Sequence, residues 1–270
     1  SMSANARVHA SILDLYDNAR LAQPTKDNMP ISWFGFEYET KSKLDEISKS
    51  SKEIVLLTQT LASPSTLKLI NEFKSKYKNV KHIVFDAISE SKSLDAFESR
   101  YGKRGLANYD FSIYKLIVSI GADFLWVLLG GGFDCSYAKG RVPNNGVMSR
   151  HIQFESNMTL SGANADLRVP LKINEQKLVL LEIYKSLVGK NKISIKSDQV
   201  LSNKIDKIVK QTIAEIKSSK QGAVIVSGLK DEKYQSLVLE INEKIKSKSY
   251  LPHETIYKRN GKDEDVNGLI

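Results

Sequence analysis

The chain has 270 residues and a formal net charge of +9. Lysines supply most of the charge along segments with helical periodicity, for example Lys204, Lys207 and Lys210. We interpret them as solvated helix faces rather than a nucleic-acid-binding stripe, which would be richer in arginine and aromatic residues. An acidic protein partner or a negatively charged membrane surface fits this charge at least as well. The only cysteine, Cys135, excludes an intrachain disulfide and a cysteine-ligated zinc or iron–sulfur site within this chain.

Apolar spacing predicts the elements of the first part of the chain. Residues 4–32 are expected to be irregular, and a helix is expected over 33–47. Buried strands are expected over 53–57 and 82–85. Between them, Ser63-Pro64 predicts a helix start, because proline is favoured at the first helical position.

The same alternation continues to about residue 246. Helices are predicted over 94–101, 175–187, 198–218 and 232–246, and strands over 115–120, 151–154 and 223–226. Short apolar strands that alternate with helices predict the α/β class, with two Rossmann-like lobes and mostly parallel sheets.

The order of these elements also suggests a division into lobes. We expect residues 4–48 to form an irregular N-terminal segment plus a helix, and 251–270 to form a polar tail. Residues 49–105 and 191–250 would make a first, discontinuous α/β lobe. Residues 106–190 would be a second, inserted Rossmann-like lobe.

Small and acidic residues follow two of the predicted strands. One strand ends in Gly121-Ala122-Asp123 and the next in Glu155-Ser156-Asn157. In parallel sheets ligands bind outside the carboxyl ends of the strands. Two strands that end in this way are typical of a dinucleotide-binding parallel sheet.

These two strand ends, Thr159, Ala165-Asp166 and Val169-Pro170-Leu171-Lys172 together resemble the molybdopterin oxidoreductase (DMSO reductase) superfamily. Residues 148–151 and 161–170 are similar to one branch. That branch is the molybdopterin-like domain of the Tat-translocated iron–sulfur subunit of alternative complex III, a bacterial quinol-oxidising respiratory complex. The resemblance implies seven candidate cofactor-binding positions: Gly121, Asp123, Glu155, Asn157, Thr159, Asp166 and Gln176. The family topology also implies that the strand ends at Gly121, Glu155 and Gly228 converge on one crevice, which we expect to be partly filled by Phe124 or other side chains.

The chain departs from the family at three of its cofactor-binding segments. Where the family has Gly-Ala-Asn-Pro, this chain has Asp123 and then Phe124, and a carboxylate there would repel a pyrophosphate. Where the family has Asp-Pro-Arg, the phosphate-pairing arginine is replaced by Asn157. The family's Pro-Gly-Thr-Asp is replaced by residues 173–176. We therefore expect the seven positions to be vestigial, with no cofactor, metal or catalytic residue in this chain.

The resemblance then implies a non-catalytic scaffold domain of a membrane-associated respiratory electron-transfer complex. Its partners would be other subunits of that complex and an iron–sulfur module of the same parent chain, with no nucleic acid. It would lie on the exported, periplasmic face of the bacterial inner membrane. Two alternatives remain open: a fragment of an active oxidoreductase that binds bis-molybdopterin guanine dinucleotide, and an unrelated nucleotide-binding module.

Targeting signals add little. No stretch reaches the roughly 18 apolar residues of a membrane span, so we expect no direct span, and no signal peptide is recognisable. Ser1-Met2-Ser3 is typical of a cloning remnant, so we expect the native N-terminus to be missing.

Four weaker signals have both a structural and a functional interpretation. The loop Gly130-Gly131-Gly132 lacks the Lys-Ser/Thr of a P-loop, which favours a plain flexible loop. The apolar segment 124–129 is either core or a docking patch with Trp126 as its anchor. Cys135 is interpreted as a small packing residue. The histidines show no metal spacing and are interpreted as structural; the alternative for His151, beside Arg150, is that it lines the crevice.

Overall fold

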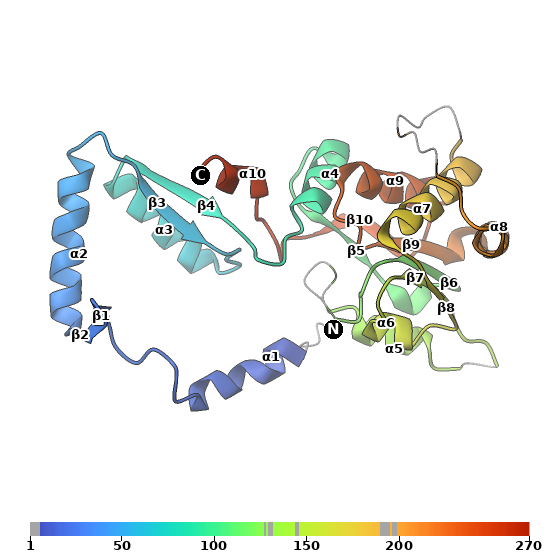
Figure 1. Cartoon of the computed structure of the whole chain (residues 1–270), viewed down its shortest axis with the longest axis horizontal. Coiled ribbons are helices and arrows are strands. Elements are labelled where there is room, and N and C mark those ends of the chain that lie inside the picture. The colour runs from blue at the N-terminus through green and yellow to red at the C-terminus, as the bar shows by residue number, and fades with distance from the viewer. Residues whose placement is uncertain are drawn as a thin grey trace. The chain divides into compact units, whose positions relative to one another are not determined.

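The computed structural model describes residues 6–126, 128, 132–143, 146–189, 195 and 199–269. It contains two compact units. The larger unit spans residues 90–259, and the smaller unit combines Ala6–Ser89 with Asn260–Ile270. The elements of both units are labelled in Figure 1.

A four-stranded parallel sheet with the strand order β8-β7-β6-β9 forms the centre of the larger unit. Its strands are β6 (Leu116–Ile120), β7 (Arg150–Glu155), β8 (Leu167–Pro170) and β9 (Ala223–Ser227). Sequence periodicity predicted all of these except β8. Together with a parallel strand pair in the smaller unit, this sheet confirms the α/β class with Rossmann-like lobes.

Helices cover both faces of this sheet. The long ones are α4 (Ser91–Tyr101), α7 (Ile173–Leu187), α8 (Asn203–Ser219) and α9 (Glu232–Lys244). All four were predicted, with ends displaced by a few residues. The prediction for α8 began at residue 198, which lies outside the described residues.

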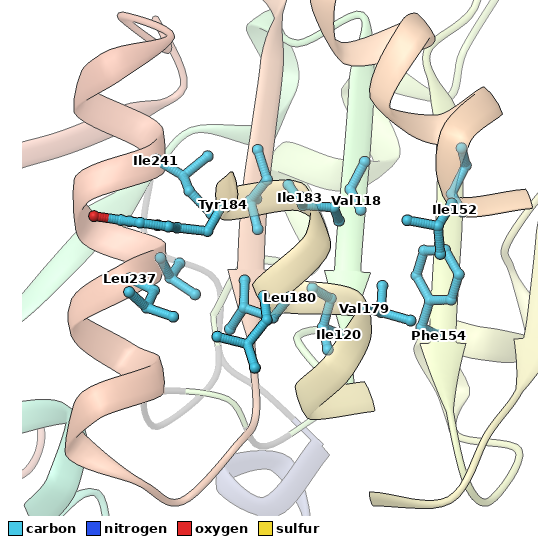
Figure 2. Close-up of a cluster of buried hydrophobic side chains, with 14 of the residues drawn as sticks. Val118, Ile120, Ile152, Phe154, Val179, Leu180, Ile183, Tyr184, Leu237 and Ile241 are labelled. Atoms are coloured by element: carbon cyan, nitrogen blue, oxygen red, sulfur yellow. The ribbon is translucent and has the colours of Figure 1, made fainter. Parts of the chain in front are cut away.

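Side chains of β6 alternate between two hydrophobic clusters, as the period of two in a strand requires. Val118 and Ile120 lie in the first cluster with residues of α7, α8 and α9, whereas Ile117 lies in the second with α4. Figure 2 shows the first cluster, where Val179 and Ile183 of α7 face the sheet. Burial on both faces explains why the strand reads as a continuous apolar run.

The strand β9 lies at an edge of the sheet, yet all of its residues are buried. The side chain of Asn242 in α9 replaces a neighbouring strand there. Its Oδ1 accepts a hydrogen bond from the Ile225 N–H (2.9 Å), and its Nδ2 donates to the Ile225 carbonyl (2.7 Å). Asn242 is fully buried, so this amide satisfies edge groups that water cannot reach.

A second, antiparallel sheet of the larger unit was not predicted. It pairs β5 (Leu106–Tyr109) with β10 (Tyr250–Ile256), and the register shifts between Leu251 and Ile256. The segment expected as a polar tail from residue 251 therefore contributes a strand to this unit. The described residues of this unit also form short helices: η2 (Phe111–Ile113), α5 (Asp134–Gly140), α6 (Leu160–Ala163) and η5 (Lys220–Gly222).

The structure also corrects the expected division into lobes. Strand β9, assigned from sequence to the first lobe, pairs along its whole length with β6 of the expected second lobe. Residues 106–190 and 191–250 thus share one sheet and one core rather than forming two lobes. The apolar run of β9 gave no information about which strand it pairs with.

The smaller unit is built around the parallel pair β3 (Ile54–Thr58) and β4 (Val80–Val84). Beyond residue 32, the described helices of this unit are α2 (Trp33–Ser48), α3 (Pro64–Lys76) and α10 (Asp263–Asn267). The predicted start of α3 is confirmed, because the Ser63 side chain accepts from the Thr66 N–H and Pro64 is the first helical residue.

The segment expected to be irregular, residues 4–32, has regular elements where it is described. They are α1 (Ala6–Ala10), η1 (Ser11–Tyr16) and a small hairpin of β1 (Thr25–Lys26) and β2 (Met29–Pro30). Its turn residues Asp27 and Asn28 have φ values of 50° and 65°. Asp and Asn tolerate this left-handed conformation, which the common two-residue hairpin turns require.

Candidate functional site

The three predicted strand ends do converge. Gly121 after β6, Glu155 at the end of β7 and Gly228 after β9 all line one crevice of about 420 Å³ in the larger unit. Parallel pairing of the three strands brings their carboxyl ends to the same edge of the sheet. The crevice therefore lies where parallel α/β folds bind ligands.

The backbones at Gly121 and Gly228 approach each other closely at the base of the crevice. A Cβ at Gly228 would lie 2.1 Å from the Gly121 carbonyl oxygen, and Gly121 itself has a φ of 64°. Only glycine meets both conditions without displacing backbone.

The side chain of Gln176 in α7 lies over Gly121, where a Cβ would be 2.4 Å from its Oε1. Gln176 is held there because its Nε2 donates to Ser156 Oγ (2.8 Å) and to the Leu171 carbonyl (3.1 Å). We expected Phe124 or another side chain to fill the crevice. Phe124 does not, because it is fully buried in the second hydrophobic cluster.

The carboxylate of Glu155 is bound within the protein. It accepts from Thr159 Oγ1 (2.7 Å), Arg168 Nε (2.5 Å) and Gln153 Nε2 (3.1 Å). Burial raises its pKa, but the bonds from Thr159 and Arg168 outweigh burial and hold the pKa below its usual value. Glu155 is thus an ionised carboxylate with its acceptor positions engaged by internal donors.

Thr159 is a helix cap as well as a partner of Glu155. Its Oγ1 accepts from the Gly162 N–H (3.0 Å) at the start of α6. Asn157, which lies between Glu155 and Thr159 in the sequence, lines the crevice and is exposed. Of the seven positions taken from the resemblance, five line the crevice: Gly121, Glu155, Asn157, Thr159 and Gln176.

The remaining two positions lie elsewhere. Asp123 accepts from the Ser161 N–H (3.1 Å) and Oγ (2.8 Å), so it ties the loop after β6 to α6. Asp166 is bound by Arg141 (2.7 and 2.9 Å) and the His151 N–H (2.7 Å), near the amino ends of β7 and β8. These partners hold the pKa of Asp166 below its usual value despite its burial. Asp166 belongs to the opposite end of the sheet from the crevice.

Sequence analysis missed a polar row along one face of β7. His151, Gln153 and Glu155 alternate with apolar residues and are all buried. His151 Nε2 and Gln153 Oε1 are 3.0 Å apart, and Gln153 Nε2 donates to Glu155. The period-two spacing of these residues was the available signal. His151 lies inside this row. It does not line the crevice, so the alternative role for His151 there is wrong.

Two lysines on the crevice rim were also missed, and both have acidic partners. Lys177 lies 3.9 Å from Asp231, and Lys230 lies 2.7 Å from the nearly buried Glu90. Neither lysine is a bare cation directed into the crevice.

The crevice can be compared with what a dinucleotide cofactor needs, which is N–H donors for its pyrophosphate. The Gly121 and Gly228 N–H groups donate to the Phe154 (2.7 Å) and Ile120 (3.0 Å) carbonyls. The Leu229 N–H donates to Ser227 Oγ (3.1 Å). These three backbone donors are engaged by the protein itself and are not available to a pyrophosphate.

The other sequence signals have the following outcomes. Cys135 is exposed, so its interpretation as a packing residue is wrong. Phe124 and Leu128 are core residues, whereas Trp126 is 38% exposed. Gly130 and Gly131 lie outside the described residues. Within the described residues, no cluster of three or more His, Cys, Asp or Glu side chains is placed to bind a metal ion.

Every helix in the described part of the chain is too short or too polar to cross a bilayer.

No protein-family model matches the chain, and no curated protein matches it either. Among solved structures, the fold is similar to acetylene hydratase from Pelobacter acetylenicus, with a TM-score of 0.54 and 12% identity. The match covers 92% of this chain but only 39% of that one, so the chain spans about two fifths of its length. At this identity the likeness shows the fold alone.

A second solved structure is the formyltransferase/hydrolase complex (FhcABCD) from Methylorubrum extorquens in complex with methylofuran. It has a TM-score of 0.48 and 10% identity, and the match covers 76% of this chain and 54% of that one.

Proposed function

We propose that this chain is a scaffold domain with the fold of a molybdopterin enzyme and without cofactor chemistry of its own. The observation that carries this proposal is the internal pairing of the crevice. Gln176 lies over Gly121, and Glu155 is engaged by Thr159, Arg168 and Gln153. A ligand-binding crevice keeps donors and acceptors for its ligand, whereas this one uses them to hold its own strands and helices together.

Electrostatics support the same proposal. A pyrophosphate placed at the three strand ends would lie near the ionised Glu155 carboxylate, which repels it. The rim lysines Lys177 and Lys230 are neutralised in part by Asp231 and Glu90. The arginine that would pair with phosphate in the family is absent at Asn157.

The finer part of the proposal rests on the resemblance of segments 148–151 and 161–170. We place the domain in a membrane-associated, quinol-oxidising respiratory complex, on the exported face of a bacterial inner membrane. Its partners there would be neighbouring subunits and an iron–sulfur module of the same parent chain. Any iron–sulfur cluster must be ligated outside this sequence, because the sequence has one cysteine.

One observation favours the alternative, a cofactor-binding fragment of an active oxidoreductase. The crevice lies at the ligand-binding edge of the sheet, and its volume of about 420 Å³ falls within the usual range for small-molecule sites. A shift of the Gln176 side chain would open its base at Gly121.

Cofactor content tests the central claim. The chain, produced in a host that makes molybdopterin cofactors, should contain neither molybdenum nor tungsten by elemental analysis. It should also release no pterin fluorescence on denaturation. Stoichiometric metal together with pterin would refute the scaffold proposal and establish the alternative.

Nucleotide affinity tests the structural reason. Calorimetric titration with GDP, which carries the guanine and pyrophosphate of the cofactor, should give no saturable binding at the crevice. The reference protein for this titration carries Lys115→Gln, Lys220→Gln and Lys248→Gln, which remove the lysines of a separate hollow at the other end of the sheet. Gln176→Ala removes the side chain over Gly121, and Asn174→Ala, at an exposed position nearby, is the matched control. Binding by this reference protein would contradict the proposal, whereas binding only after Gln176→Ala is added to it would show which side chain closes the crevice.

Co-purification tests the proposed assembly. Affinity purification of the full-length parent protein from detergent-solubilised membranes should recover an iron–sulfur subunit and membrane-spanning subunits. Recovery of the protein alone from the soluble fraction would contradict the respiratory-complex assignment without affecting the cofactor result.

A further inference from the structure

A second hollow lies at the opposite end of the main sheet, beside the amino ends of β6 and β9. Its volume is about 510 Å³, and it is lined by Lys115, Lys220 and Lys248 together with Ser218, Ser219 and Ile113. Because the strands are parallel, this hollow and the crevice lie at opposite ends of the same sheet.

The three lysines come from separate parts of the chain. Lys115 precedes β6, Lys220 follows α8, and Lys248 lies between α9 and β10. No carboxylate lines the hollow. In the described part of the chain, none of the ion pairs involves any of these lysines, in contrast to Lys177 and Lys230 at the crevice.

Backbone hydrogen bonds hold the three lysine-bearing segments together. The Lys115 N–H donates to the Gly222 carbonyl (2.7 Å), and the Lys248 N–H donates to the Gln221 carbonyl (3.0 Å). The Lys115 side chain packs across Gly222, where a Cβ would be 3.0 Å from its Cγ. The lysines are therefore anchored by the sheet and not carried on a free loop.

Lys220 also has an unusual backbone conformation, with φ 48° and ψ −128°. Glycine adopts this region readily, whereas a residue with a Cβ is strained there. A lysine at the end of α8 is explained in part by the negative end of the helix dipole. That explanation covers neither Lys115 nor Lys248, which lie on other elements.

Three cations around one hollow repel one another, and a hollow concentrates their field. An anion bound between them removes this repulsion. A phosphate group carries more charge in a compact volume than a carboxylate, and lysine is a common phosphate ligand. The Ser219 hydroxyl, which also lines the hollow, can donate to a phosphate oxygen, whereas the Ser218 hydroxyl donates to the Glu215 carbonyl (3.0 Å).

We infer that this lysine hollow binds a phosphate group, carried either by a small soluble molecule or by a lipid headgroup. The site is independent of the proposed scaffold function, because it shares no lining residue with the crevice. Lys115, Lys220 and Lys248 line the hollow without any carboxylate, and this arrangement favours an anionic ligand.

Calorimetry with inorganic pyrophosphate at about 50 mM salt, where screening is modest, tests the soluble source. The site variant carries Lys115→Gln, Lys220→Gln and Lys248→Gln. The control variant removes the same charge from exposed helix positions, by Lys204→Gln, Lys207→Gln and Lys233→Gln. Wild type should bind one pyrophosphate per chain, and the site variant should lose about tenfold or more in affinity while the control stays close to wild type.

Sedimentation with vesicles of equal parts phosphatidylglycerol and phosphatidylcholine tests the lipid source, again with both variants. Binding of either probe that is lost selectively in the site variant supports the site and names its source. The inference is overturned if neither probe binds saturably, or if both variants lose affinity equally, since the effect would then be general surface charge. Thermal melts of the three proteins check that each is folded.

Discussion

Acid should destabilise the larger unit through His151. Its ring is fully buried between Phe124, whose centroid is 5.1 Å away, and the polar row of β7. The ring nitrogens lie 3.2 Å from Tyr137 Oη and 3.0 Å from Gln153 Oε1. Burial lowers the pKa of His151 from 6.5 to about 4, because the charged imidazolium is poorly solvated there.

The sign and size of the effect follow from this shift. As the pH falls below 6.5, the unfolded chain binds a proton at this position while the folded chain does not, so stability is lost. Between about pH 7.5 and about pH 4.5, the lowered pKa of His151 removes about 2.5 kcal/mol from the free energy of unfolding. The loss ends near pH 4, where the folded protein also binds the proton.

Urea unfolding of wild type and His151→Gln at both pH values isolates this contribution. The variant should be less stable at the higher pH, where it loses packing and hydrogen bonds. The difference between their free energies of unfolding should then shrink by about 2.5 kcal/mol at the lower pH, because only wild type carries the titrating group. His253→Gln, at an exposed position, controls for removal of a histidine as such. A gap that stays constant within error would refute the burial argument.

Three further predictions can be tested by urea unfolding at neutral pH. Asn242→Ala should lower the free energy of unfolding by roughly 2–4 kcal/mol, because it leaves the buried N–H and carbonyl of Ile225 unpaired. A loss below about 1 kcal/mol would show that water reaches this edge of the sheet. Phe124→Ala should lower the free energy of unfolding by about 3–5 kcal/mol, and Trp126→Ala should lower it clearly less, because Phe124 is fully buried and Trp126 is 38% exposed. Equal losses would show that Trp126 is a core residue and not a docking anchor. Lys220→Gly should raise the free energy of unfolding by about 1 kcal/mol, because the relief of backbone strain exceeds the entropic cost of glycine. The same substitution should weaken pyrophosphate binding, and stabilisation without weaker binding would contradict the role of this lysine.

The sequence alone determined the α/β class and the positions of most strands and long helices. Residues 116–120 and 223–227 could be recognised as strands because both faces are buried, so all of their side chains except Ser119 and Ser227 are apolar. The start of α3 was equally accessible, because Ser63 and Pro64 act on their own neighbours in the chain. The convergence of the three strand ends was expected from the topology of the family that the chain resembles, and it required no knowledge of the side chains there.

Interactions between distant segments could not be derived in this way. The pairing of β5 with β10 joins residues about 140 positions apart, and neither strand carries a period that identifies the other. Asn242 reads as an ordinary helix residue, because its edge-capping role depends on where α9 lies against β9. Phe124 was expected in the crevice because it follows Asp123 in sequence, but the loop turns it into the core.

The candidate sites divide in the same manner. Sequence and resemblance identified five residues that do line the crevice, because they follow strands whose ends lie at one edge. Only the tertiary structure decided that Gln176 lies over Gly121 and that Arg168 engages Glu155. It also brought together the lysines at positions 115, 220 and 248, which are unremarkable in sequence. Periodicity is a local property of the chain, whereas side-chain partners are set by how the sheet and its helices pack.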